Sequence, residues 1–285
     1  MLGYYSGKFD VLRGKDLQEL DELIQKNKEN GNEYFALAIY DDNLCEVLNI
    51  GTPLKSIEDR LKIAKEISGV DFVFSIPSMD SKIIIAKAKE AYNKFIEEKD
   101  KDKEEEKRPK KYKLGYVPGT YDLFHAGHLE NLLEASNNCE KIVVGVKSDS
   151  LVKEHKNINT TINALERMEI LRHFKFVDNV YQYYTRDPHT AIAWIESKYN
   201  QKVDAMFLGS DLKNDFKNIH DINIIFTDRD LNKMGIRSSS GYRKKIKTLG
   251  IIKEGNVHYR GEDISKQVKK GKNDGDKKEI KLVEL

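Results

Sequence analysis

Short aliphatic segments alternate with segments of helical periodicity along the second half of the chain. Five segments have the composition of strands, in the order KLGYVPGTYD, KIVVGVKSD, VDNVYQY, DAMFLGSD and INIIFTD. Helices are expected at GHLENLLEAS, at 163–174, where Leu165, Met168, Ile170 and Leu171 are apolar, at 188–199 and at SSSGYRKKIKTL. This repetition predicts an α/β fold with a Rossmann-like parallel sheet flanked by helices on both faces.

The first hundred residues repeat this pattern. At an offset of 112, LGYYSGKFDVLRGKDLQEL aligns with LGYVPGTYDLFHAGHLENL, and the offset later becomes 107, which fits a longer loop around 26–33 in the first copy. The identical pairs are Leu2/Leu114, Gly3/Gly115, Tyr4/Tyr116, Gly7/Gly119, Asp10/Asp122, Leu17/Leu129, Leu20/Leu132, Asp42/Asp149, Leu44/Leu151, Arg60/Arg167, Ile63/Ile170, Val70/Val177, Asp71/Asp178, Val73/Val180 and Asp80/Asp187. Because the identities keep their order across strands, helices and loops, we interpret them as a duplication, and the fold is expected twice.

One charged segment separates the two copies. Residues 97–111 contain seven acidic and seven basic residues and no apolar one, so this segment is expected to be a solvated linker or the end of the preceding helix. The C-terminal segment is rich in lysine and glycine, and it is expected to be a polar tail with a short strand at IKLVEL. The predicted organisation is a first domain at 1–96, a linker at 97–111, a second domain at 112–252 and a tail at 253–285.

Composition narrows the classes of function. The chain has 285 residues, of which 39% are hydrophobic and 34% charged, enough to build packed cores under a highly charged surface. The formal net charge is only +2, which argues against a nucleic-acid binder. No apolar run is long enough for a membrane span and no secretory signal is visible, so we expect a cytoplasmic protein. Cys45 and Cys139 are too few for a disulfide framework or a cysteine-rich zinc site.

The sharpest local pattern is GTYDLFHAGH at 119–128, where a predicted strand ends and a helix begins. Parallel α/β sheets bind their ligands at this edge. Gly119 allows a tight turn, and Gly127 leaves room for a phosphate at the helix start, where free N–H groups favour an anion. His125 and His128 flank Gly127, so both imidazoles can donate hydrogen bonds to one phosphate as negative charge develops. A lone histidine here would more simply be a cap or a surface residue, and no cysteine or carboxylate stands at zinc-motif spacing.

This segment resembles the HxGH signature of the nucleotidyltransferase superfamily, especially its cytidylyltransferase branch, which includes the glycerol-3-phosphate, choline-phosphate and ethanolamine-phosphate cytidylyltransferases. The resemblance extends over about residues 112–248. It implies tandem nucleotidyltransferase-like domains, and transfer of a nucleoside monophosphate from CTP or ATP to a small phosphorylated acceptor with release of pyrophosphate. It also implies a Mg²⁺ ion and no covalent intermediate, so that catalysis is mostly positioning and charge stabilisation.

The resemblance assigns roles to further positions. The expected catalytic residues are His125, His128 and Lys156, with Lys153 as the alternative to Lys156. Asp122 is the expected metal ligand. The expected nucleotide-binding residues are Gly119, Thr120, Tyr121, Gly127, Arg167, Gly209, Asp211, Ser238, Ser239 and Ser240. The expected substrate-binding residues are Lys175, Arg229 and Arg243. Each signal alone has a simpler explanation, such as a solvated lysine or a serine N-cap, and the interpretation rests on their order behind the HxGH element.

The first copy lacks these chemical groups. The positions of His125, Gly127, His128, Thr120 and Lys156 are occupied by Arg13, Lys15, Asp16, Lys8 and Asn49, respectively. A bulky lysine and a negative charge at the helix start disfavour triphosphate binding. The first copy also ends before any equivalent of FLGSD or RSSSG. We therefore expect it to be noncatalytic, and to serve in packing or dimerisation or to shape the entrance of the active site.

The sequence leaves three functions open. The first is a cytidylyltransferase that makes a CDP-alcohol from glycerol phosphate or a similar acceptor. The second is an adenylyltransferase that uses ATP on a phosphorylated sugar or a pantetheine-like acceptor. The third is a noncatalytic nucleotide-binding scaffold, which the two intact histidines argue against. The GSD loop and the absence of a sugar-kinase domain favour CTP, and the resemblance implies a homodimer.

Overall fold

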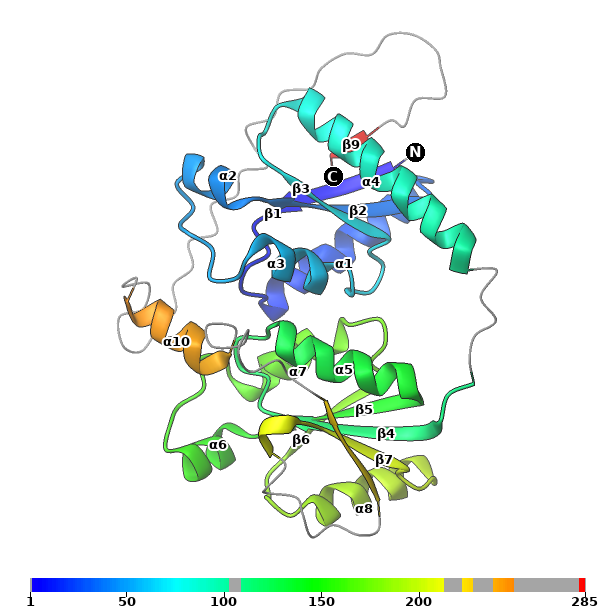
Figure 1. Cartoon of the computed structure of the whole chain (residues 1–285), viewed down its shortest axis with the longest axis vertical. Coiled ribbons are helices and arrows are strands. Elements are labelled where there is room, and N and C mark those ends of the chain that lie inside the picture. The colour runs from blue at the N-terminus through cyan, green and yellow to red at the C-terminus, as the bar shows by residue number, and fades with distance from the viewer. Residues whose placement is uncertain (1, 103–108, 213–221, 228–237, 249–281, 285) are drawn as a thin grey trace.

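The computed structural model describes residues 2–102, 109–212, 222–227, 238–248 and 282–284. They form two α/β units, each built on a parallel sheet flanked by helices (Figure 1). This arrangement confirms the predicted fold class. No helix within the described ranges is long and apolar enough to cross a membrane.

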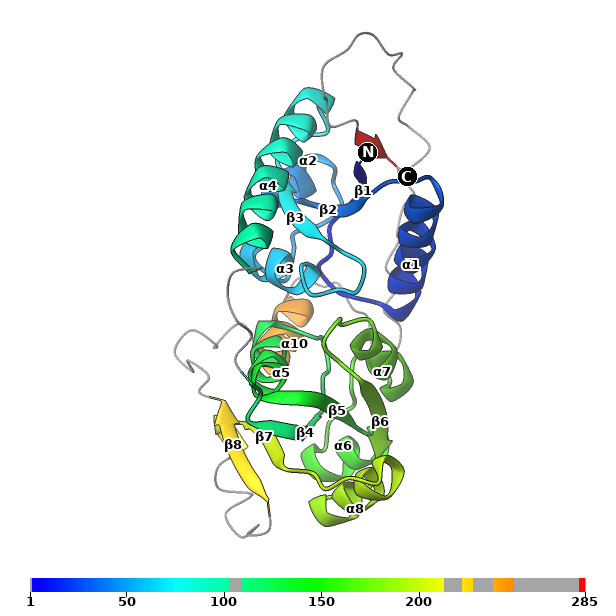
Figure 2. The same cartoon turned by 90° about the vertical axis from the view of Figure 1, so that its right-hand side faces the viewer.

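The first unit contains a parallel sheet in the order β3-β2-β1-β9. Its elements are β1 (Leu2–Gly7), α1 (Gly14–Glu29), β2 (Tyr34–Tyr40), α2 (Asp42–Val47), α3 (Ile57–Ala64), β3 (Phe72–Ile76), α4 (Ser81–Asp102) and β9 (Leu282–Glu284). Helix α4 covers one face of the sheet, where Ile84 and Ala88 are buried beside Phe72 and Phe74. Helices α1 and α3 cover the opposite face, which is turned toward the second unit (Figure 2).

The second unit contains a parallel sheet in the order β6-β5-β4-β7-β8. Its elements are β4 (Tyr112–Gly119), α5 (Ala126–Asn138), β5 (Cys139–Lys147), α6 (Asp149–Lys156), α7 (Ala164–Arg172), β6 (Asn179–Tyr183), α8 (Pro188–Tyr199), β7 (Ala205–Gly209), the 3₁₀ turn η1 (Ser210–Leu212), β8 (Asn223–Thr227) and α10 (Ser239–Thr248). Helix α8 packs on one face, while α5 and α7 cover the face turned toward the first unit. Within α7, Leu165 does not join the apolar face, because 71% of it is exposed.

Side-chain caps explain where the helices of the second unit begin. Ser148, Asn163 and Asp187 each accept a hydrogen bond from a backbone N–H in the first turn of α6, α7 and α8. Such caps satisfy N–H groups that have no partner within the helix. They fix the start of each helix at the carboxyl edge of the sheet, where the strands end.

Two elements lie at the predicted boundaries of the units. Helix α4 continues to Asp102, so the first part of the charged segment 97–111 is the end of that helix. Strand β9 pairs with β1 through Gly3 and Val283, at the position where β4 pairs with β7 through Gly115 and Ala205. The first sheet therefore has a strand at the place of the FLGSD strand, and the C-terminal segment supplies it.

Equivalent side chains make equivalent contacts in the two units. The Arg60 guanidinium donates to the carbonyls of Lys55, Lys8 and Tyr40 and to the Asp42 carboxylate. The Arg167 guanidinium does the same at the matching positions, which are the carbonyls of Ile162, Thr120 and Lys147 and the Asp149 carboxylate. Asp10 and Asp122 likewise accept from matching pairs of backbone N–H groups. These contacts support the hypothesis of a duplication.

The two units dock through reciprocal contacts. The Ser68 N–H donates to the His173 carbonyl (2.7 Å), and the Lys175 N–H donates to the Glu66 carbonyl (3.1 Å). At the offset of 107, Ser68 matches Lys175 and Glu66 matches His173. Helix α1 also packs on α7 while α3 packs on α5, and one apolar cluster runs through both units. This reciprocity is the pattern of a two-fold symmetric interface, here formed within one chain.

Candidate functional site

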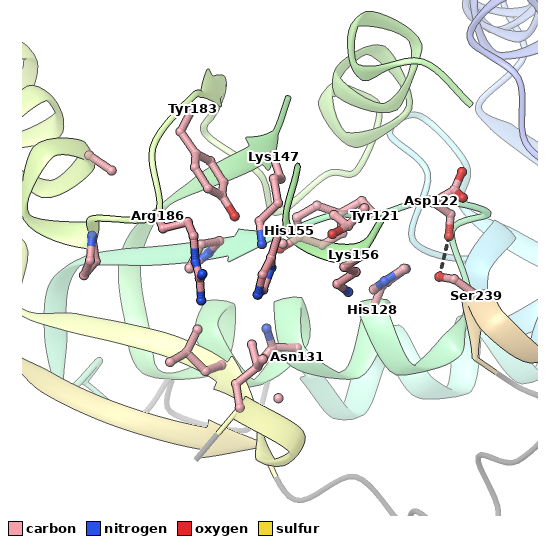
Figure 3. A pocket seen from close by; sticks show the side chains of 18 of the residues that line it. Tyr121, Asp122, His128, Asn131, Lys147, His155, Lys156, Tyr183, Arg186 and Ser239 are labelled. Carbon is pink, nitrogen blue, oxygen red and sulfur yellow. Dashed lines mark hydrogen bonds between the residues drawn. The ribbon is translucent and has the colours of Figure 1, made fainter. Parts of the chain in front are cut away.

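A pocket of about 460 Å³ opens at the carboxyl edge of the second sheet. Its walls come from the β4–α5 loop, the end of α6, the β6–α8 loop, the end of β7 and the start of α10. In a parallel sheet, these loops lie together because all strands point the same way. Figure 3 shows the side chains that line the pocket.

The β4–α5 loop is tightly folded. Tyr121 and Leu123 adopt positive φ angles of 58° and 51°, which non-glycine residues rarely do and which recur at functional loops. The Tyr121 hydroxyl donates to the Val117 carbonyl (3.0 Å), and the Tyr121 ring covers Gly119 so closely that a Cβ there would lie 2.7 Å from it. Only glycine therefore fits at position 119, and the packed loop holds the start of α5 in place.

His125 and His128 stand at the start of α5, and both line the pocket. Their ring centroids are 3.7 Å apart with an interplanar angle of 21°, so the imidazoles are stacked. His125 is 2% exposed, and its Nε2 lies 3.3 Å from the Ser239 hydroxyl of α10. The pocket thus contains two imidazoles and a helix N-terminus, which together can donate to phosphate oxygens.

Asp122 joins the β4–α5 loop to helix α10. Its buried carboxylate accepts from the N–H groups of Thr161 and Ile162 and from Arg243 Nη1 (2.5 Å). The Ser239 hydroxyl donates to the Asp122 carbonyl (2.7 Å). Through these bonds, Asp122 and Arg243 hold the serines of α10 beside the histidines.

Asp122 does not fit the predicted role of metal ligand. Both its oxygens already accept hydrogen bonds, and the positive charge of Arg243 lies beside it. Within the described ranges, no three His, Cys, Asp or Glu side chains are grouped as a metal site. The residues described here therefore do not form a protein-held Mg²⁺ site.

Most of the other predicted nucleotide-binding residues line the same pocket. These are Gly119, Thr120, Tyr121, Gly209, Ser238, Ser239 and Ser240, and they are joined by Lys156 and Arg243. Lys156 is exposed in the last turn of α6. Its alternative, Lys153, instead donates to Asn159 outside the pocket lining (3.0 Å). Gly127 is buried in the first turn of α5.

Two predicted ligand-binding residues lie elsewhere. Arg167 is fully buried and donates to the Thr120 and Lys147 carbonyls, so it fixes the ends of two strands and does not reach the pocket. Lys175 donates to the Lys65 carbonyl and pairs with Glu66 (3.2 Å) at the interface between the units. Neither Arg167 nor Lys175 lines the pocket in this arrangement.

Two further predictions fall outside what the structure describes. Asp211 lies in η1, but its side chain is not described, and Arg229 lies in the undescribed segment 228–237.

The first unit contacts helix α10 directly. Lys245 Nζ donates to the carbonyls of Pro53 (2.9 Å) and Leu54 (3.1 Å). Lys55 is buried, and its ammonium lies 5.4 Å from the centroid of the Tyr242 ring. The helix that carries the serines of the site is thus held by both units.

The buried ammonium of Lys55 is electrostatically costly. Burial lowers its pKa, and this effect outweighs the opposing influence of the Asp10 and Asp59 carboxylates. The Lys55 ammonium also donates to the Asp10 carbonyl.

A family model for cytidylyltransferase-like proteins matches residues 116–265, just over half of the chain. The chain belongs to the cytidylyltransferase-like family. The match covers the histidine pair, the α6 lysine and the serines of α10, which together surround the pocket.

Individual relatives match shorter stretches of this cytidylyltransferase-like chain. The bifunctional protein HldE of Hyphomonas neptunium is 35% identical over 28% of this chain and 17% of its own length. The probable ethanolamine-phosphate cytidylyltransferase of Encephalitozoon cuniculi is 33% identical, over 26% of this chain and 23% of its own length. The probable choline-phosphate cytidylyltransferase of Schizosaccharomyces pombe is 40% identical, over 23% of this chain and 18% of its own length. The matched regions therefore span less than a quarter of each of these relatives.

One solved structure is also similar. It is described as the lipopolysaccharide core biosynthesis protein from Thermoplasma volcanium GSS1, and it is 18% identical with a TM-score of 0.35. The similarity covers 41% of this chain and 97% of that protein.

The pocket also contains residues that the sequence analysis missed. They are Asn131, Lys147, His155, Tyr183 and Arg186, among others. Lys147 and Tyr183 are the last residues of β5 and β6, so their place at the carboxyl ends of parallel strands was a usable signal. Asn131 gave no such signal, because it is a buried helix residue whose amide contacts the Phe207 carbonyl (3.4 Å).

In the first unit of this cytidylyltransferase-like chain, the corresponding helix start has a different use. Arg13, at the position of His125, donates from its guanidinium to Glu166 of α7. The adjacent Gly14 N–H also faces the Glu166 carboxylate (3.4 Å). The helix start that lines the pocket in the second unit therefore contacts the other unit in the first.

Proposed function

We propose that the chain is a cytidylyltransferase. It transfers CMP from CTP to a small phosphorylated alcohol, of which glycerol phosphate is the simplest, and it yields a CDP-alcohol and pyrophosphate. The observation that carries this proposal is the stacked pair His125 and His128 at the start of α5, facing Ser239 of α10 in a basic pocket.

The chemistry follows from the placement of these groups. An oxygen of the acceptor phosphate attacks the α-phosphorus of CTP and forms the new P–O bond. The bond from that phosphorus to the bridging oxygen breaks, and pyrophosphate leaves with the electron pair. His125 and His128 donate to the phosphate oxygens on which charge develops, while Lys156 neutralises the leaving pyrophosphate.

Helix α10 contributes to phosphate binding. Ser238, Ser239 and Ser240 bring hydroxyls and the first N–H groups of α10 to the pocket. Among the described residues, no three His, Cys, Asp or Glu side chains are grouped to hold Mg²⁺. A Mg²⁺ ion would therefore come with the nucleotide, and it would neutralise phosphate charge.

The choice of CTP is supported by the family and by the names of the relatives. Two relatives are named as ethanolamine-phosphate and choline-phosphate cytidylyltransferases. We assign the chemistry to the second unit alone, because the first has Arg13 and Asp16 at the histidine positions and uses Arg13 to dock. The homodimer stays a prediction, which sedimentation of the full chain tests.

The test is pyrophosphate release by the full chain with each of the four nucleoside triphosphates, Mg²⁺ and a panel of phosphorylated alcohols. Release with CTP, and its loss in a folded His128→Ala variant, is the expected result. Release with ATP alone would make the chain an adenylyltransferase. No release with any pair would leave a nucleotide-binding scaffold and overturn the proposal.

A further inference from the structure

We propose that the pocket selects an acceptor that has a second negative group, such as a carboxylate, in addition to its reacting phosphate. Lys147 and Arg186 bind that second group. This inference rests on the proposed transferase function, and it names the chemical class of the acceptor.

Lys147 and Arg186 lie on one side of the pocket because of the strand register. Lys147 ends β5 and is paired with Tyr183, which ends β6, and the Ser148 N–H donates to the Tyr183 carbonyl (3.0 Å). Arg186 follows three residues later, directly before Asp187, which caps α8. In Figure 3, Tyr183 and Arg186 lie toward one end of the pocket, and Lys147 lies next to them near its middle.

The other end of the pocket fits the nucleotide. His128 and Ser239 lie there, as Figure 3 shows. His128 belongs to α5, the helix after β4, and Ser239 is the first residue of α10. The strand order reverses between β4 and β7. The strands that follow β4 in the chain, β5 and β6, lie on one side of it in the sheet, and β7 and β8 lie on its other side. Nucleotides bind at such switch points in α/β sheets. We therefore place the acceptor in the half of the pocket that lies at the ends of β5 and β6.

The charges of the lining favour an anion in that half. Among the described residues, the lining contains the carboxylates of Asp122 and Asp187. Asp122 is paired with Arg243, and Asp187 accepts from the N–H groups of His189 and Thr190 and from the Thr190 hydroxyl. The charge of Asp122 is thus offset by Arg243, while Asp187 is held at the start of α8, next in sequence to Arg186.

A cationic acceptor would be repelled. The aromatic ring of Tyr183 could contact an ammonium group, but Lys147 and Arg186 place two positive charges on the same side of the pocket (Figure 3). Within the part of the chain that the structure describes, Arg186 forms none of the ion pairs found. Its planar guanidinium matches the two oxygens of a carboxylate.

The first experiment compares acceptors of similar size with the wild-type chain and CTP. The acceptors are 3-phosphoglycerate, glycerol 3-phosphate and ethanolamine phosphate, whose second groups are anionic, neutral and cationic. We expect kcat/KM to fall in that order, by about tenfold or more between the first and the last. A preference for ethanolamine phosphate overturns the inference while the transferase function stands. No turnover with any acceptor and any nucleotide overturns the transferase function, and the inference with it.

The second experiment removes the charges one at a time. Lys147→Met and Arg186→Met are expected to raise KM for 3-phosphoglycerate by about 10- to 100-fold, and to raise KM for glycerol 3-phosphate and for CTP by much less. Lys198→Met, an exposed lysine on α8 outside the pocket lining, is the matched control. Equal losses with charged and neutral acceptors, or a raised KM for CTP, would contradict the assignment. Arg186→Glu should shift the preference toward ethanolamine phosphate.

Discussion

Arg167 and Arg60 offer a matched pair of substitutions within one chain. Both guanidiniums are fully buried, and each donates to three carbonyls and one carboxylate at equivalent positions. Arg167 differs in one respect, because the carbonyls of Thr120 and Lys147 belong to residues that line the pocket. Arg167→Lys and Arg60→Lys therefore make the same chemical change in the unit that carries this pocket and in the other unit.

The cost can be worked out from the contacts. A lysine keeps the charge and one or two bonds, but it cannot reproduce the planar fork that reaches several carbonyls. Two lost hydrogen bonds from a charged donor cost about 1.5–3 kcal/mol each, and partial rearrangement lowers the sum to about 3 kcal/mol. The exposed carboxylates of Asp149 and Asp42 add little, because water solvates them. Against a typical total of about 5–15 kcal/mol, both variants should stay folded.

The two variants should differ in turnover. Arg167→Lys loosens the ends of β4 and β5, and a displacement of ~1 Å at a reacting centre lowers the rate by about a hundredfold. Arg60→Lys loosens the first unit and reaches the pocket only indirectly, through the segment Pro53–Lys55 that contacts α10. Its kcat should therefore fall by about tenfold at most, while stability falls by the same ~3 kcal/mol. Urea denaturation gives the two free energies of unfolding, and pyrophosphate release gives the two values of kcat. Equal losses of kcat in both variants would refute the positioning role of Arg167.

Three further predictions concern the site and its supports. His128→Ala should lower kcat by ~10²–10³, whereas Asp16→Ala, at the matching place in the first unit, should leave it nearly unchanged; a large loss in the latter would assign chemistry to the first unit. Lys245→Met removes the hydrogen bonds from α10 to the first unit and should lower kcat about tenfold or more. Lys247→Met, which changes an exposed lysine on the same helix, should leave kcat unchanged. Equal kcat values of the two variants in a pyrophosphate assay would contradict the support of α10 by the first unit. Because burial lowers the pKa of Lys55, the folded chain binds fewer protons there than the unfolded chain. The contribution of Lys55 to the free energy of unfolding should therefore rise with pH between its lowered pKa in the folded chain and its ordinary value of about 10.5, and urea titrations in that window should show a steeper rise in wild type than in Lys55→Met.

The sequence predicted the elements well where local patterns decide them. The second unit has all the expected strands, and the helix expected at 188–199 spans Pro188–Tyr199. Aliphatic runs and caps such as Asp187 act over a few residues, so they can be recognised without knowing the fold. The segment 119–128 was likewise expected at a strand end and a helix start, where β4 ends and α5 begins, because these parts are adjacent in the chain.

The errors concern contacts between segments that are distant in the sequence. Arg167 and Lys175 stood in the expected order, but the pattern could not show that one is buried on carbonyls and the other lies between the units. The docking of Lys245 onto Pro53 joins residues separated by most of the chain. A one-dimensional pattern has no information on such contacts, since they depend on how the completed units pack.

Strand β9 has a consequence for the order of events during synthesis. The second sheet, whose strands lie between residues 112 and 227, is available to fold well before residues 282–284 leave the ribosome, at about 5–20 residues per second. The first sheet begins at Leu2 but gains its fourth strand only with those late residues. The completion of the first sheet therefore depends on pairing between two segments that are far apart in the sequence, and such pairing forms slowly. The first unit is thus synthesised before the second, but its sheet is completed after that of the second.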